Sequence, residues 1–404
     1  MGKEVSSRVR YDTALYMCRL IRCAIEDITP PPIPENVNIQ KIYSLAKHNS
    51  VEGLLYYAVS RIPNVDDKDF VKKWETVLNS IIFRTANFDA ERDTILTEMK
   101  KRGLSYICLK GIRLSKLYPM PGMRSMADND ILFSYTDLND YGKYSYSDNK
   151  SISEASDSLA EIMKGLGYDL HYSTEKDDVY HKAPFYNFEM HKKLARDGDT
   201  FASYYEDPWN RATVTGNGEL TFSPEDDFIY NIIHMYKHFT SAGCGIRHIC
   251  DLYVIDKAIG NSLDYSYIEN ELRSIGLYDF YRNMTDFTRK IFSDKSDAKE
   301  YDEETMELLL FFLGCGTFGN MEGIIHNRMK NASEKSGGSE KKAKFYYIFK
   351  RIFPSRSDIR NNHHFIYKHP YLIPGLYLLR IGRGLFFKSR LIFDEFSKII
   401  KKDK

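Results

Sequence analysis

The chain has 404 residues, of which 43% are hydrophobic and 28% are charged, as in a folded globular protein. Its length predicts about two or three folding units. The formal net charge of +1 hides an uneven distribution, because residues 341–404 hold 16 basic and 4 acidic residues, whereas the first 340 hold 41 and 52. These numbers exclude a uniformly basic nucleic-acid-binding protein.

Membrane-spanning and disulfide-rich classes are also disfavoured. No apolar run approaches the ~18 residues that a membrane span needs, and the residues after Met1 are polar where a secretory signal would be apolar. The six cysteines show no Cys-x-x-Cys spacing, which favours free thiols in a reducing compartment over disulfides or a zinc site. We therefore expect a cytoplasmic protein.

The N-terminal part of the chain is predicted to be helical. Apolar residues recur at helical spacing in three stretches, at 9–27, 39–59 and 70–101. The proline-rich segment 29–34 separates the first two as an extended linker. Gly103 fits the C-cap of the third helix, because glycine adopts the left-handed conformation found at helix ends.

Strand-like runs then alternate with polar segments. Segment 134–152 is rich in Tyr, Asp and Asn and is interpreted as a loop insertion, and 153–164 as a helix. From Pro224 onward the pattern is helical again, with Ser223 as N-cap. Segment 330–344 has the composition of a flexible connector. Strands are predicted at 104–109, 126–133, 168–172, 179–182 and 186–191.

These elements predict an α+β protein with a small mixed β-sheet flanked by N-terminal and C-terminal helical regions. We expect four segments. Residues 1–103 form a helical region, 104–215 the sheet-containing core and 216–330 a second helical domain. Residues 331–404 form the connector and a basic, amphipathic tail.

The chemistry is concentrated in the core, beginning with Asp128 and Asp130. Alternate residues of a strand face the same side, so their carboxylates are expected to lie together. Two such carboxylates repel each other unless a cation lies between them, and oxygen ligands of this kind suit Mg²⁺. An Asp-x-Asp pair alone fits a solvated edge strand or a turn equally well.

The residues around this pair point to phosphate chemistry. The strand that ends at Lys110-Gly111 enters a short amphipathic stretch, 112–118, so backbone N–H groups at a helix start could bind an anion. Gly111 lets the backbone approach closely. Arg124 could clamp phosphate oxygens with two hydrogen bonds. Alternatively, Lys110 is a solvated charge and Arg124 pairs with an aspartate of the motif.

Together these stretches resemble the uncharacterised bacterial nucleotidyltransferase family of the DNA polymerase β superfamily. That family usually shows Leu-Leu-Lys-Gly, then Tyr-Pro-x-Pro, then Arg-Pro-Met-Gly-Asp-Ile-Asp-Leu-Leu-Val. The matching stretches here are Leu109-Lys110-Gly111, Tyr118-Pro119-Met120-Pro121 and Arg124-Ser-Met126-Ala-Asp128-Asn-Asp130-Ile-Leu132. Phe188-Glu189-Met190-His191 resembles the later acidic strand of the family. His234, His238, Arg247 and Asp251 follow in the family's order.

The resemblance implies transfer of a nucleoside monophosphate from an NTP, with ATP favoured, to a hydroxyl of a protein or a metabolite, releasing pyrophosphate. Asp128 and Asp130 would hold one Mg²⁺, and Glu189 would share a second and help to take the acceptor's proton. Lys110, the Gly111 amide and Arg124 would bind phosphates. The chain departs from the superfamily in having Gly-Ile where Gly-Ser is widespread, and from the family in having Asn129 between the aspartates.

Two other functions stay open, a non-catalytic interaction protein that retains the fold and a metal-dependent phosphohydrolase. We expect His191 to be packed or hydrogen-bonded, His234 and His238 to hold no zinc, and Arg247 and Asp251 to form a helix ion pair. The acidic body disfavours a nucleic-acid acceptor. The basic tail at 341–404 is most simply a solvated face, and contact with a peripheral membrane surface or an acidic partner is the alternative.

Overall fold

The computed structural model describes residues 2–316, apart from 66, 197, 216–218, 242 and 296–297, together with residue 371. It divides into two compact units, Met1–Tyr236 with Gly245–Leu313, and Lys237–Cys244 with Gly314–Lys404. The sheet and the candidate site lie in the first unit. Apart from Tyr371, the predicted connector and tail at 331–404 lie outside the described residues, and the predicted segment boundaries stay predictions.

The N-terminal region is helical, as predicted, and the helical pattern at 39–59 is divided into two helices. The break lies at Asn49, whose buried side chain donates hydrogen bonds to the carbonyls of Leu45 and Leu313. Ser50 follows with a φ of 52°, a left-handed conformation that ends a helix. The four helices are α1 (Gly2–Ile25), α2 (Ile39–His48), α3 (Glu52–Val59) and α4 (Lys68–Lys101).

A five-stranded sheet forms the centre of the first unit and confirms the predicted mixed α+β class. The strand order is β1-β2-β7-β6-β5, in which β2 and β7 run parallel and the other neighbours run antiparallel. The strands are β1 (Ser105–Cys108), β2 (Asn129–Ser134), β5 (Asp169–Ser173), β6 (Asp177–Lys182) and β7 (Tyr186–His191).

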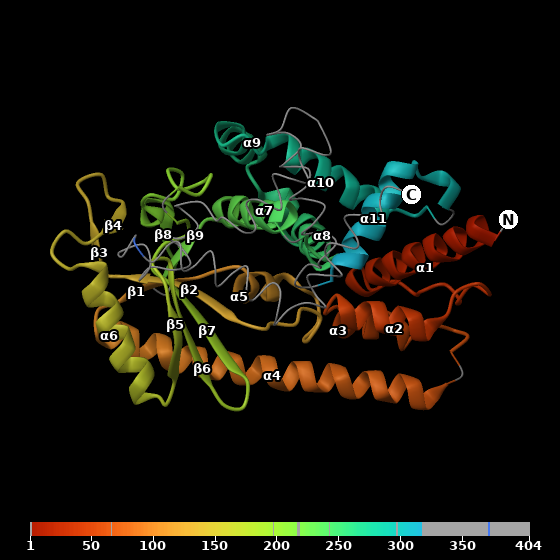
Figure 1. The fold of residues 1–404 in the computed structure, drawn as a ribbon, viewed down its shortest axis with the longest axis horizontal. Coiled ribbons are helices and arrows are strands. Elements are labelled where there is room, and N and C mark those ends of the chain that lie inside the picture. Colours follow the sequence, from red (N-terminus) through yellow and green to blue (C-terminus); the bar gives the residue numbers. More distant parts are fainter. Residues whose placement is uncertain are drawn as a thin grey trace. The chain divides into compact units, whose positions relative to one another are not determined.

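The two faces of the sheet have different chemistry, because side chains alternate along each strand. One face carries Ile131, Phe133, Phe188 and Met190 and packs on the long helix α4 and on α6 (Ile152–Gly165), as Figure 1 shows. This apolar layer is the core of the sheet region. The opposite face of β2 and β7 carries the carboxylates of the candidate site.

The polar residue on the packed face, Asn129, has a specific partner. Arg92 of α4 is buried with 6% of its surface exposed, and it donates a hydrogen bond of 3.0 Å to the Asn129 side-chain oxygen. The same guanidinium pairs with Asp89 on the next turn of the helix. An amide at this position therefore joins α4 to the strand that bears the aspartates, where an apolar residue would leave the Arg92 Nη1 without this acceptor.

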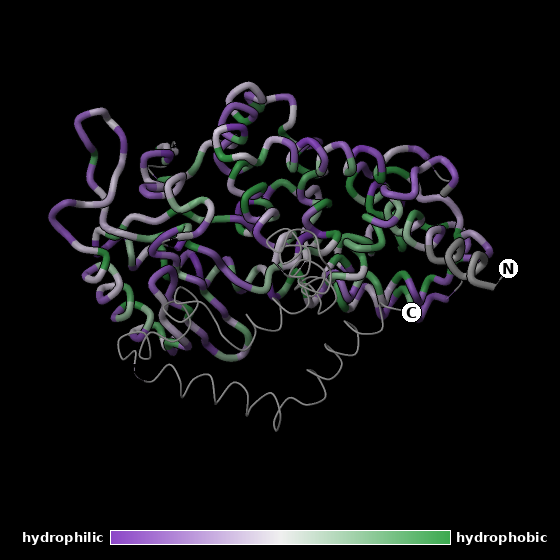
Figure 2. The backbone as a smooth tube through the Cα atoms, turned by 45° about the horizontal axis from the view of Figure 1, so that its top comes forward, coloured by the Kyte–Doolittle hydropathy of each residue, from purple (hydrophilic) through white to green (hydrophobic). Residues whose placement is uncertain are grey.

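Segment 134–152 corrects the expected loop, because part of it is a hairpin of β3 (Thr136–Leu138) and β4 (Tyr144–Tyr146). Gly142 has a φ of 70° in its turn. The segment is hydrophilic, as Figure 2 shows by its purple colour. The Tyr146 hydroxyl donates to the Lys192 carbonyl at 2.9 Å, which ties the hairpin to the end of β7.

The chain beyond the sheet is mainly helical, as predicted. The Ser223 hydroxyl accepts a hydrogen bond from the Asp226 N–H, which confirms it as the N-cap of α7. Among the described helices, none is long and apolar enough to span a membrane. The remaining elements are β8 (Ala212–Val214), β9 (Leu220–Phe222), α7 (Pro224–Ser241), α8 (Arg247–Ile259), α9 (Tyr265–Ser274), α10 (Tyr278–Ile291) and α11 (Glu303–Cys315).

The Arg92–Asn129 contact generates a stability prediction. Arg92→Leu should lower the free energy of unfolding by about 1–3 kcal/mol, because it leaves a buried amide oxygen without its donor. The double variant Arg92→Leu/Asn129→Val should recover part of this loss. Urea denaturation measures both, with exposed Lys101→Ala on the same helix as the control. If Arg92→Leu lowers the free energy of unfolding no more than the control does, the role of this contact is contradicted.

Candidate active site

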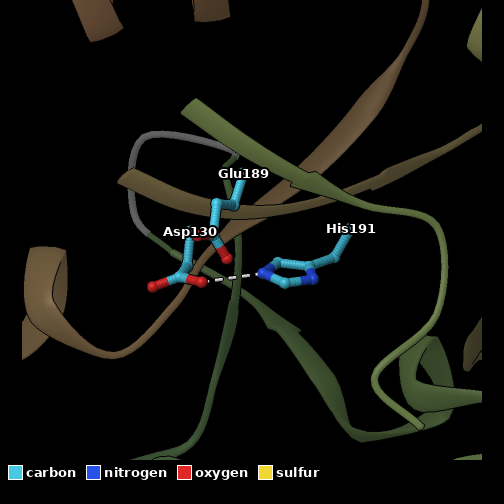
Figure 3. Close-up of side chains that lie close together, drawn as sticks. All are labelled: Asp130, Glu189 and His191. Carbon is cyan, nitrogen blue, oxygen red and sulfur yellow. Dashed lines mark hydrogen bonds and ion pairs between the residues drawn. The ribbon is translucent and has the colours of Figure 1, made fainter. Parts of the chain in front are cut away.

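The pairing of β2 with β7 brings two of the predicted carboxylates together. Asp130 is directly opposite Glu189 in the parallel register, and Asp128 precedes the strand by one residue. Figure 3 shows the Asp130 and Glu189 side chains converging beside His191. An oxygen of each carboxylate and a ring nitrogen of His191 lie within 4.8 Å of one another. Asp128 stands outside this group of three.

The three carboxylates influence one another electrostatically. Burial, followed by the charge of Asp130, raises the pKa of Asp128. Burial and the charges of Asp130 and Asp128 raise the pKa of Glu189 to about 7. Burial alone would also raise the pKa of Asp130, but the Lys110 ammonium and the His191 hydrogen bond hold it below its usual range. Such crowding of acids in a partly buried site favours the binding of a cation.

Lys110 reaches the site through an unusual turn between β1 and the short helix α5 (Gly111–Leu114). Its φ of 41° lies in the region that favours glycine, a conformation that costs about 1–3 kcal/mol. The Leu109 N–H donates to the Asp130 carbonyl at 2.9 Å, which holds the turn against β2. As a result the Lys110 ammonium lies 2.9 Å from an Asp130 oxygen. The structure thus accounts for Lys110 as a partner of Asp130, and phosphate binding stays a prediction.

His191 is hydrogen-bonded, in line with the prediction from sequence. Its Nε2 lies 2.8 Å from the Asp130 oxygen, and the ring is 1% exposed. Burial lowers its pKa, so the ring is neutral and Nε2–H donates to Asp130. The buried Nδ1 has no hydrogen-bond partner among the described residues and lies 3.9 Å from an Asp177 oxygen. In this arrangement His191 orients the Asp130 carboxylate.

Arg124, predicted to bind phosphate, is held by a different carboxylate. Its guanidinium donates two hydrogen bonds to Asp251 of α8, at 2.7 and 3.0 Å, and the Tyr118 hydroxyl donates to the same group. Both ionic side chains are less than a tenth exposed. The sequence predicts a helix ion pair between Arg247 and Asp251. In the structure the ion-pair partner of Asp251 is Arg124 instead, and Arg247 donates a hydrogen bond of 3.4 Å to the Ser125 carbonyl. The pair therefore anchors the loop that leads into β2.

Gly111 lies against this arginine. A Cβ at Gly111 would come within 3.1 Å of the Arg124 Nη1, so a side chain there would press on the guanidinium. The same approach leaves Nη1 facing the backbone of the Lys110-Gly111 turn. A phosphate contact by Arg124 or Gly111 stays a prediction.

Sequence reasoning missed two neighbours of the carboxylates, Lys176 and Tyr230. Lys176 lies in the turn between β5 and β6, and Tyr230 on α7 is 6% exposed. Burial raises the pKa of Tyr230 to about 12; the charge of Lys110 opposes this increase, and the charge of Asp130 adds to it. Neither residue belongs to a motif, so only the folded arrangement identifies them.

Among the residues that the structure describes, His234 and His238 of α7 lie outside the one group of side chains close enough to share a metal ion. Among the described residues, Asp130, Glu189 and His191 are the only three His, Cys, Asp or Glu side chains whose ligand atoms all lie within 4.8 Å of one another. The ring of His234 stacks on that of His248 at 6.0 Å.

Comparison with known proteins identifies the class. The profile of the uncharacterised nucleotidyltransferase family matches residues 35–143 and 153–293, more than half of the chain. The chain therefore belongs to this family and is a nucleotidyltransferase. No curated protein matches it significantly.

Two solved structures are similar over about half of the chain. The antibiotic-resistance factor ANT(2'')-Ia is 13% identical, with 52% of this chain and 92% of that chain covered and a TM-score of 0.24. An antigenic nucleotidyltransferase-like protein from Paracoccidioides brasiliensis is 15% identical, with 49% and 89% covered and a TM-score of 0.30. Neither likeness is close enough to bear on single residues.

The Arg124–Asp251 pair gives a second prediction. Asp251→Asn should lower the free energy of unfolding by about 3–5 kcal/mol, because Arg124 stays buried without its counter-charge. The double variant Arg124→Leu/Asp251→Leu should be milder. Thermal denaturation measures the effect, with Asp256→Asn, exposed on the same helix, as the control. Unchanged stability would contradict the structural role of this pair.

Proposed function

We propose that the protein uses Mg²⁺ to transfer a nucleoside monophosphate from an NTP, with ATP favoured, to a hydroxyl of a protein or a metabolite, releasing pyrophosphate. The observation that supports this proposal most is the direct pairing of Asp130 with Glu189 across parallel strands, with Asp128 two residues before Asp130. Membership of a nucleotidyltransferase family supports the reaction class.

The residues present fit a divalent cation. The charges of Asp128, Asp130 and Glu189 converge in a partly buried site, and the pKa values of Asp128 and Glu189 are raised by burial and by the neighbouring carboxylates. These three carboxylates would hold Mg²⁺, with oxygen ligands that it prefers. When bound, the ion neutralises phosphate charge and increases the acidity of an acceptor hydroxyl.

The side chains around the carboxylates then have separate tasks. His191 keeps Asp130 oriented by donating to one of its oxygens. Glu189, directly opposite Asp130, would help to take the acceptor's proton. Lys110 balances the charge of Asp130 and can turn its ammonium to a phosphate. The Gly111 amide and the Arg124 Nη1 complete the proposed phosphate contacts.

The acceptor is proposed to be a small molecule or a protein hydroxyl. The first 340 residues carry more acidic than basic residues, which opposes the binding of a long polyanion such as DNA. We also propose a cytoplasmic location, and a membrane surface or acidic partner for the basic tail. These proposals rest on the sequence.

The direct test is incubation of the pure protein with Mg²⁺ and each α-labelled NTP, with and without candidate acceptors. Label transfer with pyrophosphate release is expected, and Asp130→Asn should slow it by at least about 100-fold, as removal of one charge-stabilising group does in other sites. Asp169→Asn, an exposed carboxylate on edge strand β5, is the matched control. Phosphate release without label transfer would indicate a hydrolase, and no NTP binding would contradict the proposal.

Carboxylate crowding gives a separate stability prediction. In EDTA at pH 8, Glu189→Gln should raise the melting temperature by about 2–4 °C, the effect of ~1 kcal/mol in a domain of this size, because it removes a like charge. Mg²⁺ should raise the melting temperature of the wild type more than that of the variant. Glu175→Gln, on a nearby turn, is the control. A wild-type protein insensitive to Mg²⁺ would argue against the metal site.

A further inference from the structure

Lys176 is fixed at the edge of the carboxylate cluster by backbone hydrogen bonds. In the turn from β5 to β6, the Thr174 hydroxyl accepts from the Lys176 and Asp177 N–H groups at 3.1 and 3.0 Å. The Lys176 carbonyl accepts from the N–H groups of Lys192 and Lys193, at 2.7 and 3.2 Å. These contacts lock the turn against the chain that leaves β7, directly after His191.

The ammonium of Lys176 is poorly neutralised where it lies. Among the described residues its one ion-pair partner is Asp177, at 3.4 Å, and the side chain is only 22% exposed. Asp177 also accepts a hydrogen bond of 2.6 Å from the Thr174 hydroxyl, so it is shared. Burial, and then repulsion by Lys110, lower the pKa of Lys176. Two cations thus face the same carboxylate cluster from different elements.

A continuous series of contacts links these two cations. Lys176 contacts Asp177, whose oxygen lies 3.9 Å from the His191 Nδ1, and His191 contacts Asp130 at 2.8 Å. Lys110 contacts Asp130 from the other side at 2.9 Å. Lys110 therefore contacts Asp130 directly, whereas Lys176 is linked to it through Asp177 and His191. Each is partly desolvated, a state that a polyanionic ligand stabilises.

We propose that Lys176 binds the pyrophosphate portion of the NTP. This inference rests on the proposed function and adds a residue that no motif contains. The base and ribose of an NTP are uncharged. In the proposed reaction the α-phosphate is the group nearest the carboxylates. The negative charge left for a second ammonium to bind is therefore that of the β- and γ-phosphates. Lys176 is linked to the cluster through Asp177 and His191, and its weak ion pair with Asp177 can be exchanged for phosphate oxygens.

The test compares ligands that contain or lack this portion. Titration calorimetry would measure binding of Mg²⁺ with inorganic pyrophosphate, with a non-hydrolysable ATP analogue and with AMP. Lys176→Gln should weaken the first two by about 10- to 100-fold, the range for a hydrogen bond to a charged group. AMP binding should stay within about twofold, and Lys176→Arg should restore part of the loss. The KM for the NTP should rise accordingly.

Controls separate this role from a structural one. Lys193→Gln removes a neighbouring lysine that pairs with Glu175 at 3.2 Å, and it should leave all three affinities unchanged. Asp177→Asn removes the ion pair but keeps the ammonium, so it should not weaken pyrophosphate binding. Melting curves check that each variant is folded. The proposal is overturned if Lys176→Gln and Asp177→Asn lower the melting temperature equally while the affinities for all three ligands stay unchanged. Lys176 would then have a structural role only.

The outcomes also separate this inference from the proposed function. Wild-type binding of the ATP analogue that is unaffected by Lys176→Gln would overturn the inference and leave the function standing. Lys176-dependent binding of pyrophosphate without NTP binding or turnover would keep the anion site and overturn the function. A wild-type protein that binds none of these ligands would overturn both.

Discussion

The parallel pairing of β2 with β7 is the constraint on which the rest of the structure depends. It places Asp130 beside Glu189, and because strand side chains alternate, the same register turns Phe188 and Met190 toward α4 and α6. A shift of one residue would bury both carboxylates in the apolar core and expose its aromatic residues. The hydrophobic packing on one face therefore fixes the position of the acidic chemistry on the other.

The carboxylates of Asp128, Asp130 and Glu189 repel one another, and much of the stabilisation that offsets this repulsion comes from polar contacts outside the sheet. The Lys110 ammonium and the His191 ring both contact Asp130, and Lys110 does so from a backbone conformation that lysine rarely adopts. The buried Arg124–Asp251 pair anchors the loop before β2 to α8. Strained and buried polar groups of this kind persist only where the surrounding structure determines them, and they are concentrated at functional sites.

Local patterns predicted the strands and the Asp-x-Asp motif, because alternation and turn residues act within a few residues. Local patterns did not predict the break between α2 and α3 at Asn49, whose buried side chain donates a hydrogen bond to the distant Leu313 carbonyl. They also did not predict the hairpin in 134–152, because that segment is largely polar and lacks the alternation of a strand. Placing Glu189 beside Asp130 from sequence relied on family resemblance, because pairing across a long crossover has no local signal. The position of Lys176 and the pairing of Arg124 with Asp251 depend on contacts between residues distant in sequence, and no local pattern predicts those contacts.

The central claim is that Asp128, Asp130 and Glu189 bind the metal at which the NTP reacts. The most direct measurement is a crystal structure with Mn²⁺ in place of Mg²⁺ and a non-hydrolysable NTP, with the metal located by its anomalous scattering. The account predicts a metal peak bound by oxygens of Asp128 and Asp130, with the triphosphate beside it and Glu189 facing the α-phosphate. A metal or triphosphate bound elsewhere, with these carboxylates still paired to Lys110 and His191 alone, would contradict it.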